Sequence, residues 1–316
     1  MSSETAVTAE PAPAAYSGGI PATTVASLNG ASARQSQLRR NFRRFIIGNK
    51  LNLVGLIIVI LFFALAIFGQ ALAPYSPYAQ DITGSKLLAP SVSHPMGTDE
   101  LGRDLLSRVM TGTRISLQVA VVVLSFAVVF GTLVGSVAGY FGGMVDEILM
   151  RFTDMFLAFP ALILAIAIAA SLGRELHWTM VALATVFWPW YARLVRGQIL
   201  SIRERDYVAA AESIGISGPR LLARHILPNA ISVVIIQLTL DVGYAILATS
   251  SLSFIGLGAQ PPSPEWGTMM STARNYFREA WWYTTFPGLA LTLTVFAFNV
   301  LGDGLQDALD PRSGRR

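Results

Sequence analysis

Long uninterrupted apolar blocks dominate this chain and constrain its fold more than any other feature. Each long block approaches the 20 or so residues that a helix needs to cross the hydrocarbon core of a bilayer. Only 13% of the 316 residues are charged, whereas a typical soluble domain carries about 25%. The sequence therefore predicts an all-α membrane protein.

Six apolar blocks qualify as membrane spans. They cover about residues 53–73, 115–140, 152–172, 177–194, 230–255 and 284–302. The fourth block is the shortest and contains Pro189, and we expect Pro160 and Pro189 each to interrupt and kink its span. Six spans place both ends of the chain on the same side of the membrane.

The orientation follows from Lys and Arg in short loops, which favour the cytoplasmic side. With the N-terminus inside, sixteen Lys and Arg residues fall on the cytoplasmic side and seven on the outer side. Arg103, Arg108 and Arg114 cluster outside and weaken this bias. We predict a multi-pass protein with both termini in the cytoplasm.

Polar segments flank the apolar blocks. Residues 1–33 are rich in Ala, Ser, Thr, Pro and Gly, and we predict a disordered tail because they cannot bury enough apolar surface to offset the entropy of ordering. Residues 34–52 are predicted to be a basic cytoplasmic segment, residues 53–312 the six-helix membrane domain, and residues 313–316 a cytoplasmic tail.

The chain offers little for catalysis or metal binding. It has no Cys, which removes disulfides, thiol catalysis and zinc–thiolate sites. His94, His177 and His225 lie far apart without metal-ligand spacing, and no G-x-x-x-x-G-K-[ST] phosphate loop occurs. We predict no catalytic residue, metal, cofactor or ATPase site, so energy must come from a partner or an ion gradient.

The predicted cytoplasmic loop at about residues 201–228 has a helical pattern of its own. Its apolar positions fall at helical spacing: Tyr207, Ala210, Ala211 and Ile214. Gly215 is expected to stop this helix as the residue after its C-cap. Ser217 and Pro219 fit the start of a second helix, which Pro228 is expected to end. A solvated amphipathic loop is the alternative interpretation.

This loop resembles the EAA loop of ABC importer permeases, whose pattern is Glu-Ala-Ala, three residues, Gly, and further on a Leu-Pro pair. Gly215 and the pair at 227–228 match at the right separation. Ala209 stands where the family has Glu, and Glu212, one helical turn on, is the candidate to replace its charge. By this resemblance the residues that would couple the chain to an ATPase are Arg205, Tyr207, Ala209, Ala210, Ala211, Glu212, Gly215, Leu227 and Pro228.

Further blocks extend the resemblance to about residues 45–312. They lie at residues 94–104, 139–143, 192–197, 203–206, 252–262 and 301–311. Together they resemble the C-type permease subunit of dipeptide, oligopeptide and nickel ABC importers. The resemblance implies a type I, MetI-like permease fold of six transmembrane helices in the bacterial inner membrane.

The same resemblance implies a set of partners and a cargo. A second, B-type permease subunit would complete the pore, two cytoplasmic ABC ATPase subunits would drive it, and an extracytoplasmic solute-binding protein would deliver the solute. The cargo would be a small peptide, with nickel complexes or glutathione as alternatives. Membrane lipid is expected around the chain, and nucleic acid is not expected as a partner.

Asp241 is the single acid in the fifth predicted span. A carboxylate there should face protein or a watery pore, because lipid does not solvate charge. We expect Asp241 to face the translocation path or the partner permease. An ion-coupled secondary transporter would use it as an ion site, but such proteins generally show internal repeats, and the chain shows none. An intramembrane enzyme would need a catalytic set at membrane depth, which the sequence does not offer.

Overall fold

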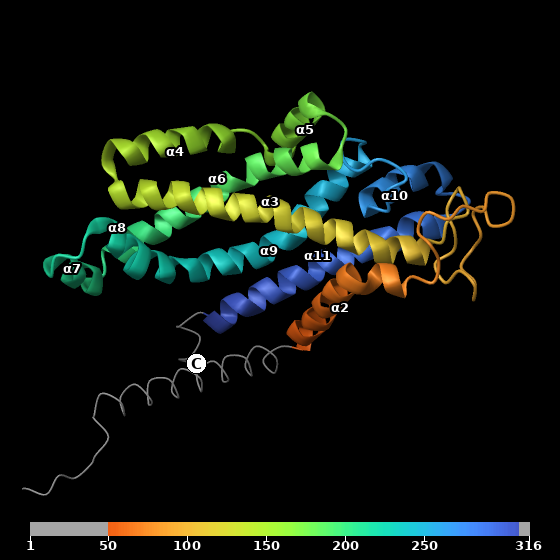
Figure 1. Ribbon diagram of the computed structural model, residues 1–316, viewed down its shortest axis with the longest axis horizontal. Helices are drawn as coiled ribbons and strands as arrows, with labels where there is room; N and C mark the ends of the chain where they lie inside the picture. Colours follow the sequence, from red (N-terminus) through yellow and green to blue (C-terminus); the bar gives the residue numbers. More distant parts are fainter. Residues whose placement is uncertain (1–49, 310–316) are drawn as a thin grey trace, which may run out of the picture. The chain divides into compact units, whose positions relative to one another are not determined.

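The structure, a computed structural model, describes residues 50–309, and every regular element in that range is helical. The elements are α2 (Lys50–Leu72), α3 (Leu105–Phe141), α4 (Gly143–Leu157), α5 (Ala161–Leu172), α6 (Leu176–Arg203), α7 (Asp206–Ser213), α8 (Gly218–Leu221), the π-helical turn η1 (Leu222–Ile226), α9 (Leu227–Phe254), α10 (Trp266–Ala273), the 3-10 turn η2 (Arg274–Tyr276) and α11 (Trp281–Leu309) (Figure 1). The all-α prediction is confirmed for this range. The predicted tail 1–33, most of the basic segment 34–52 and the tail 313–316 lie outside the described residues.

Four helices of the described range are long and apolar enough to cross a membrane. They are α2, α3, α11 and the continuous run Gly218–Phe254, and the bent pair α4–α5 makes a fifth if it counts as one span. α6 has the length, at 28 residues, but it is not among them. Pro189 and the arginines in its second half lower its mean hydropathy.

The third predicted span is not one straight helix. α4 ends at Leu157, α5 begins at Ala161, and their axes differ by 83°. Pro160 is the N-cap of α5, and its ring cannot donate a hydrogen bond to the preceding turn. The break predicted at Pro160 is confirmed. Pro189, by contrast, lies inside α6, which continues past it without interruption, so the interruption predicted there is wrong, and the kink at Pro189 stays a prediction.

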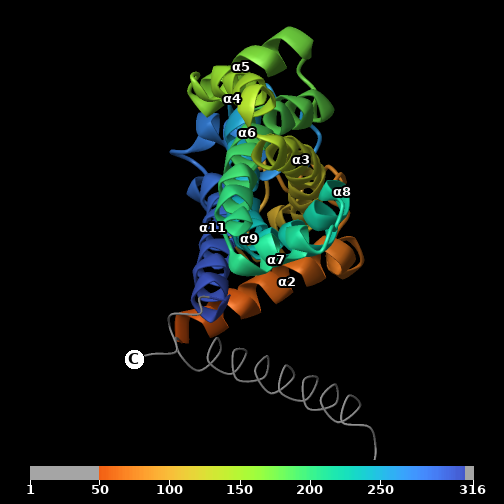
Figure 2. The same cartoon turned by 90° about the vertical axis from the view of Figure 1, so that its left-hand side faces the viewer.

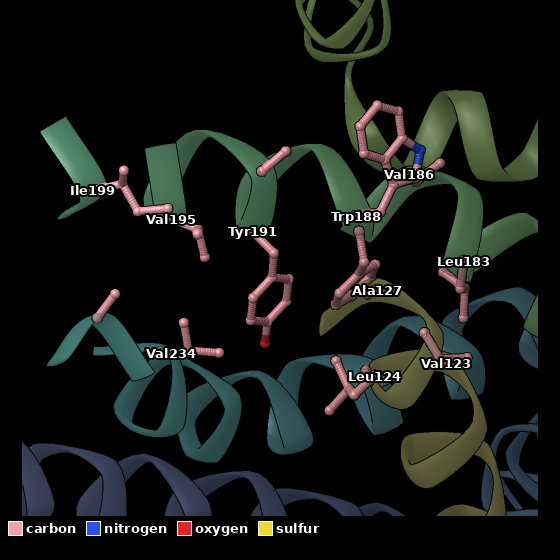
Figure 3. Packing of buried hydrophobic residues seen from close by; sticks show 14 of the residues in the cluster. Val123, Leu124, Ala127, Leu183, Val186, Trp188, Tyr191, Val195, Ile199 and Val234 are labelled. Atoms are coloured by element: carbon pink, nitrogen blue, oxygen red, sulfur yellow. The ribbon is translucent and has the colours of Figure 1, made fainter. Parts of the chain in front are cut away.

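α3 and α6 form the central layer of the bundle because α3 presents glycines at every fourth position. A Cβ on Gly131 would lie 2.5 Å from Tyr191 Cβ, and one on Gly135 would lie 2.3 Å from the Ala192 carbonyl oxygen. Small residues at this spacing allow two backbones to approach closely. Figure 3 shows the α6 side chains of this layer, with Tyr191 pointing across to α9.

The remaining helices lie on either side of this layer. α4 and α5 are on one side, and α2 and α11 are on the other (Figures 1 and 2). Edge-to-face aromatic contacts join α2 to α11 and to α10, with ring centroids 5.6 Å apart between Phe62 and Phe298 and 6.5 Å apart between Phe62 and Trp266. Such contacts stabilise a pair beyond its buried area.

Candidate functional site

The predicted cytoplasmic loop folds as two short helices, α7 and α8, joined by a glycine turn (Figure 1). Gly215 has φ +80°, a backbone conformation that glycine adopts without strain. Its amide donates to the Glu212 carbonyl at 2.9 Å, and the Ile216 amide donates to the Ala211 carbonyl at 3.3 Å. These two bonds are the Schellman arrangement that closes a helix. The helix stop predicted at Gly215 is confirmed.

The apolar residues of α7 face in two directions rather than one. Val208 and Ala211 are buried against the bundle, at 1% and 7% exposure. Tyr207 and Ile214 are 41% and 79% exposed, and Ala210 is exposed between them. We call Tyr207, Ala210 and Ile214 the outer stripe of α7. The single apolar face predicted from spacing is therefore wrong, because Ala211 packs inward.

Arg203 fixes this loop to the end of α3. Its Nη1 donates to the carbonyls of Gly139 and Tyr140 at 3.1 and 2.8 Å, which are among the carbonyls that a helix end leaves without partners. Its guanidinium also lies 5.5 Å from the centroid of the Tyr140 ring, a cation–π distance. Gly218 also lies close to that tyrosine, since a Cβ there would lie 2.4 Å from Tyr140 Oη. These contacts hold the loop in place against the end of α3.

Pro228 does not end the second helix, which corrects the sequence-based expectation. α8 continues through η1 into α9, and the Leu227 amide donates to the Leu222 carbonyl in the wider π register. Pro228 lies in the first turn of α9, just after the π turn has shifted the hydrogen-bond register. Ser217 is the N-cap of α8 as predicted, but its side chain makes no capping bond. The loop and the fifth span therefore share one continuous helical run, Gly218–Phe254.

The remaining loop residues occupy less distinctive positions. Arg205 is the exposed N-cap residue of α7, Ala209 is exposed, and Leu227 is half-buried at the start of α9. Glu212 lines a cavity of about 310 Å³ together with Leu200, Arg203 and Glu204. The structure thus brings Glu212 to this cavity, whereas Ala209 is not among its lining residues.

Asp241 lies apart from the loop, midway along α9. Its carboxylate accepts a hydrogen bond from the Tyr191 hydroxyl at 2.7 Å and from Gln237 Nε2 at 2.9 Å. Tyr191 is completely buried on α6, and Figure 3 shows its hydroxyl directed toward α9. The Tyr191–Asp241 bond therefore joins the two helices that precede and follow the loop. Sequence spacing gave no indication of this bond, because its partners are 50 residues apart.

A cluster of charged side chains lies at the end of the bundle opposite the loop. Arg103 and Arg108 are only 3% and 2% exposed, and Asp99 between them is 0% exposed. The Asp99 carboxylate lies 2.6 Å from Arg103 Nε and 3.5 Å from Arg108 Nε. Arg108 also donates to the backbone carbonyls of Pro77 and Pro262. Two arginines that sequence counting treats as loop charges are therefore buried and paired.

Comparison with protein families gives two matches. Residues 131–315 match the family described as binding-protein-dependent transport system inner membrane component. Residues 36–90 match the N-terminal transmembrane domain of oligopeptide transport permease C. The first match includes the loop and Asp241, and the second includes all of α2.

Relatives with similar sequences match most of the chain. The probable D,D-dipeptide transport system permease protein of Escherichia coli K12 is 46% identical over 267 residues, 84% of this chain and 89% of that protein. The dipeptide transport system permease protein of Alkalihalophilus pseudofirmus is 45% identical over 264 residues, 84% and 86% of the two chains. The glutathione transport system permease protein of Pectobacterium atrosepticum is 42% identical over 276 residues, 87% and 91%. The chain therefore belongs to the family of binding-protein-dependent transport system inner membrane components, in its oligopeptide permease C branch.

Proposed function

We propose that this chain is one of two different permease subunits that together carry short peptides into the cytoplasm. ATP hydrolysis on two partner ATPase chains drives the cycle, and an extracytoplasmic binding protein delivers the peptide. Relatives named for D,D-dipeptide and dipeptide transport support a short peptide as cargo. The relative named for glutathione transport supports glutathione as the alternative.

In this proposal α6 is a sixth span and both termini lie in the cytoplasm. α6 is buried along most of its length, so it need not be apolar on every side to cross the membrane. Because Arg103 and Arg108 are paired inside the protein, they do not act as free loop charges. Without them, five outer Lys and Arg residues remain against sixteen cytoplasmic ones, which favours this orientation.

The observation that carries the proposal is the outer stripe of α7 on a loop fixed by Arg203. An exposed apolar stripe on a short, well-anchored helix suits insertion into a groove of another protein. Movement of α7 would reach α8 across the Gly215 turn and then pass through η1 directly into α9, because α8, η1 and α9 form one continuous run. The Tyr191–Asp241 bond would carry it across to α6. Packed helices transmit such rigid-body shifts.

Replacing Ile214 with Glu tests the ATPase contact. The side chain is 79% exposed, so we expect the permease to fold normally while ATPase binding and peptide uptake fall about tenfold or more, as for a central interface residue. Co-purification of the ATPase chains and uptake by reconstituted vesicles measure the two effects. Ala209→Glu is the matched control, because it adds the same charge where the family carries Glu. Uptake by the permease without ATPase chains would contradict the proposal.

Gly215→Val tests the turn between α7 and α8. No atom lies within 4 Å of a Cβ at this position, so the cost comes only from φ +80°, which a β-branched residue adopts poorly. We expect ATP hydrolysis to continue while uptake per ATP falls several-fold. Gly215→Asn should stay close to the parent protein, because Asn tolerates this conformation. Normal coupling in the valine variant would count against the role of the loop.

Asp241→Leu tests the link between α9 and α6. The change leaves the Tyr191 hydroxyl and the Gln237 amide without their acceptor inside the bundle, which is unfavourable for buried polar groups. We expect weaker coupling of ATP hydrolysis to uptake, and the same direction for Tyr191→Phe. Tyr244→Phe is the control, because phenylalanine keeps the ring contact that Tyr244 makes with Phe187. Unchanged assembly and transport in Asp241→Leu would show that this carboxylate faces neither the path nor a functional contact.

A further inference from the structure

α4 carries two unlike exposed faces. Its apolar stripe consists of Met144, Ile148, Phe152 and Met155, all exposed. Its charged stripe consists of Glu147, Arg151 and Asp154, whose side chains are 62%, 78% and 55% exposed. At about 100° per residue the two stripes are about 90° apart around the helix. An apolar stripe suits lipid, whereas exposed charges on a membrane-crossing segment need water or protein.

The charged stripe continues onto the second half of α6. Arg193 donates to the Asp154 carboxylate, and Arg196 holds Asp146 with two parallel bonds of 2.5 Å each. A surface cavity of about 420 Å³ lies along α4 and is closed on one side by Arg196 of α6; its α4 lining includes Asp146, Met150 and Asp154. We call this the α4–α6 cavity.

The charges around the α4–α6 cavity are balanced and differ in how firmly they are held. Three acids, Asp146, Glu147 and Asp154, line the cavity together with Arg151 and Arg196, and Arg193 borders it through its contact with Asp154. Arg196–Asp146 is bidentate and mostly covered, at 32% and 16% exposure. Arg193–Asp154 is a single contact with both side chains about half exposed, at 52% and 55%. Most donors of Arg193 therefore stay available, since a guanidinium carries five.

We propose that the α4–α6 cavity is part of the translocation path and binds the charged ends of the peptide cargo. The carboxylate of the peptide binds Arg193, which offers a planar fork for bidentate contact, and its ammonium group binds Asp154. Each end replaces one half of the exposed Arg193–Asp154 pair, so no charge is left alone. This inference rests on the proposed function, because it takes a short peptide as the solute.

A zwitterion fits this cavity better than a lipid phosphate does. Arg151, Arg193 and Arg196 attract a phosphate group, but the equal number of acids, Asp146, Glu147 and Asp154, repel it. A molecule with separated positive and negative ends meets both signs favourably. Binding at this place would also let peptides of different side chains pass, since only the two ends are contacted.

The chain contains no Cys, so one introduced cysteine is the only thiol on it. Labelling of that thiol in the complete transporter in lipid nanodiscs measures whether water and ligand reach the cavity. Met150→Cys places a thiol in the cavity lining, and Met155→Cys, five residues on, places the matched thiol on the apolar stripe. A membrane-impermeant maleimide should label the first and not the second, measured by mass on this chain. A free dipeptide should slow labelling of Met150→Cys about fivefold or more through its charge-assisted bonds.

Competing ligands and variants decide the outcome. The same dipeptide acetylated and amidated should not slow labelling, and neither should glycerol phosphate. Adding Arg193→Gln or Asp154→Asn to Met150→Cys should abolish protection, while Arg174→Gln in an outer loop should preserve it. No labelling of Met150→Cys, equal protection by the blocked peptide, protection by glycerol phosphate, or protection that survives both pair variants would each overturn the inference. The labelling assay does not measure ATPase coupling. Failure of the proposed cargo site can therefore be told apart from failure of the proposed function.

Discussion

Asp99→Asn should lower the free energy of unfolding by about 3–5 kcal/mol, the usual cost of removing one member of a buried ion pair. The carboxylate is completely buried between Arg103 and Arg108. Its Oδ1 also accepts the backbone amides of Leu101 and Arg103, at 2.9 Å each. The asparagine keeps the shape but leaves two buried guanidinium groups without their shared counter-charge.

Thermal unfolding of the purified protein in detergent, together with its yield in the membrane, measures this effect. Asp81→Asn is the matched control on the same side of the bundle. Asp81 is exposed, and its two oxygens accept from the Ser85 hydroxyl and the Gly84 amide, which lower the pKa of its carboxyl group. The amide oxygen of asparagine can keep the bond from Gly84, and its NH2 group can donate to the Ser85 hydroxyl oxygen. We expect this variant to unfold at nearly the same temperature as the parent. A similar midpoint for Asp99→Asn would show that the buried arginines do not depend on this carboxylate.

Gly135→Ala should destabilise the bundle by about 3 kcal/mol, the upper part of the usual range for overpacking. The new methyl would lie 2.3 Å from the Ala192 carbonyl oxygen and 3.0 Å from Val195 Cβ. The nearer atom belongs to the backbone of α6, so it cannot turn away as a side chain can. α3 and α6 would have to separate, and the core around Tyr191 (Figure 3) would loosen with them.

Gly197→Ala makes the same chemical change on α6 where no atom lies within 4 Å of the added Cβ. Alanine is the better helix former by about 1 kcal/mol, so this variant should be as stable as the parent or slightly more so. Thermal unfolding and recovery of the assembled permease pair distinguish the two glycines. Equal stability of both variants would mean that close approach of α3 to α6 is not what the glycine spacing provides.

The glycine spacing also shows how far a sequence pattern extends. Gly131, Gly135 and Gly139 all contact α6, but Gly143 continues the same interval and meets nothing within 4 Å. α3 ends at Phe141, and Gly142 and Gly143 have positive φ values that turn the chain into α4. Glycine thus allows close helix packing within α3 and allows a positive φ in the turn after it. Spacing alone does not separate the two roles.

The sequence by itself determined the helical class, most of the apolar segments, the break at Pro160, the two-helix loop and the turn at Gly215. These features depend on local periodicity, on proline and glycine geometry, and on runs of apolar residues, all of which are readable within a few turns. The family resemblance was readable for the same reason, since its motifs are short and contiguous.

Only the tertiary structure decided which distant residues meet. Arg203 reaches the end of α3 63 residues earlier, Tyr191 bonds Asp241 50 residues later, and Arg108 reaches Pro262 154 residues away. It also decided that Ala211 packs inward while Ile214 faces out. Such contacts depend on how whole helices pack, because burial and pairing of a charge are properties of its neighbours in space.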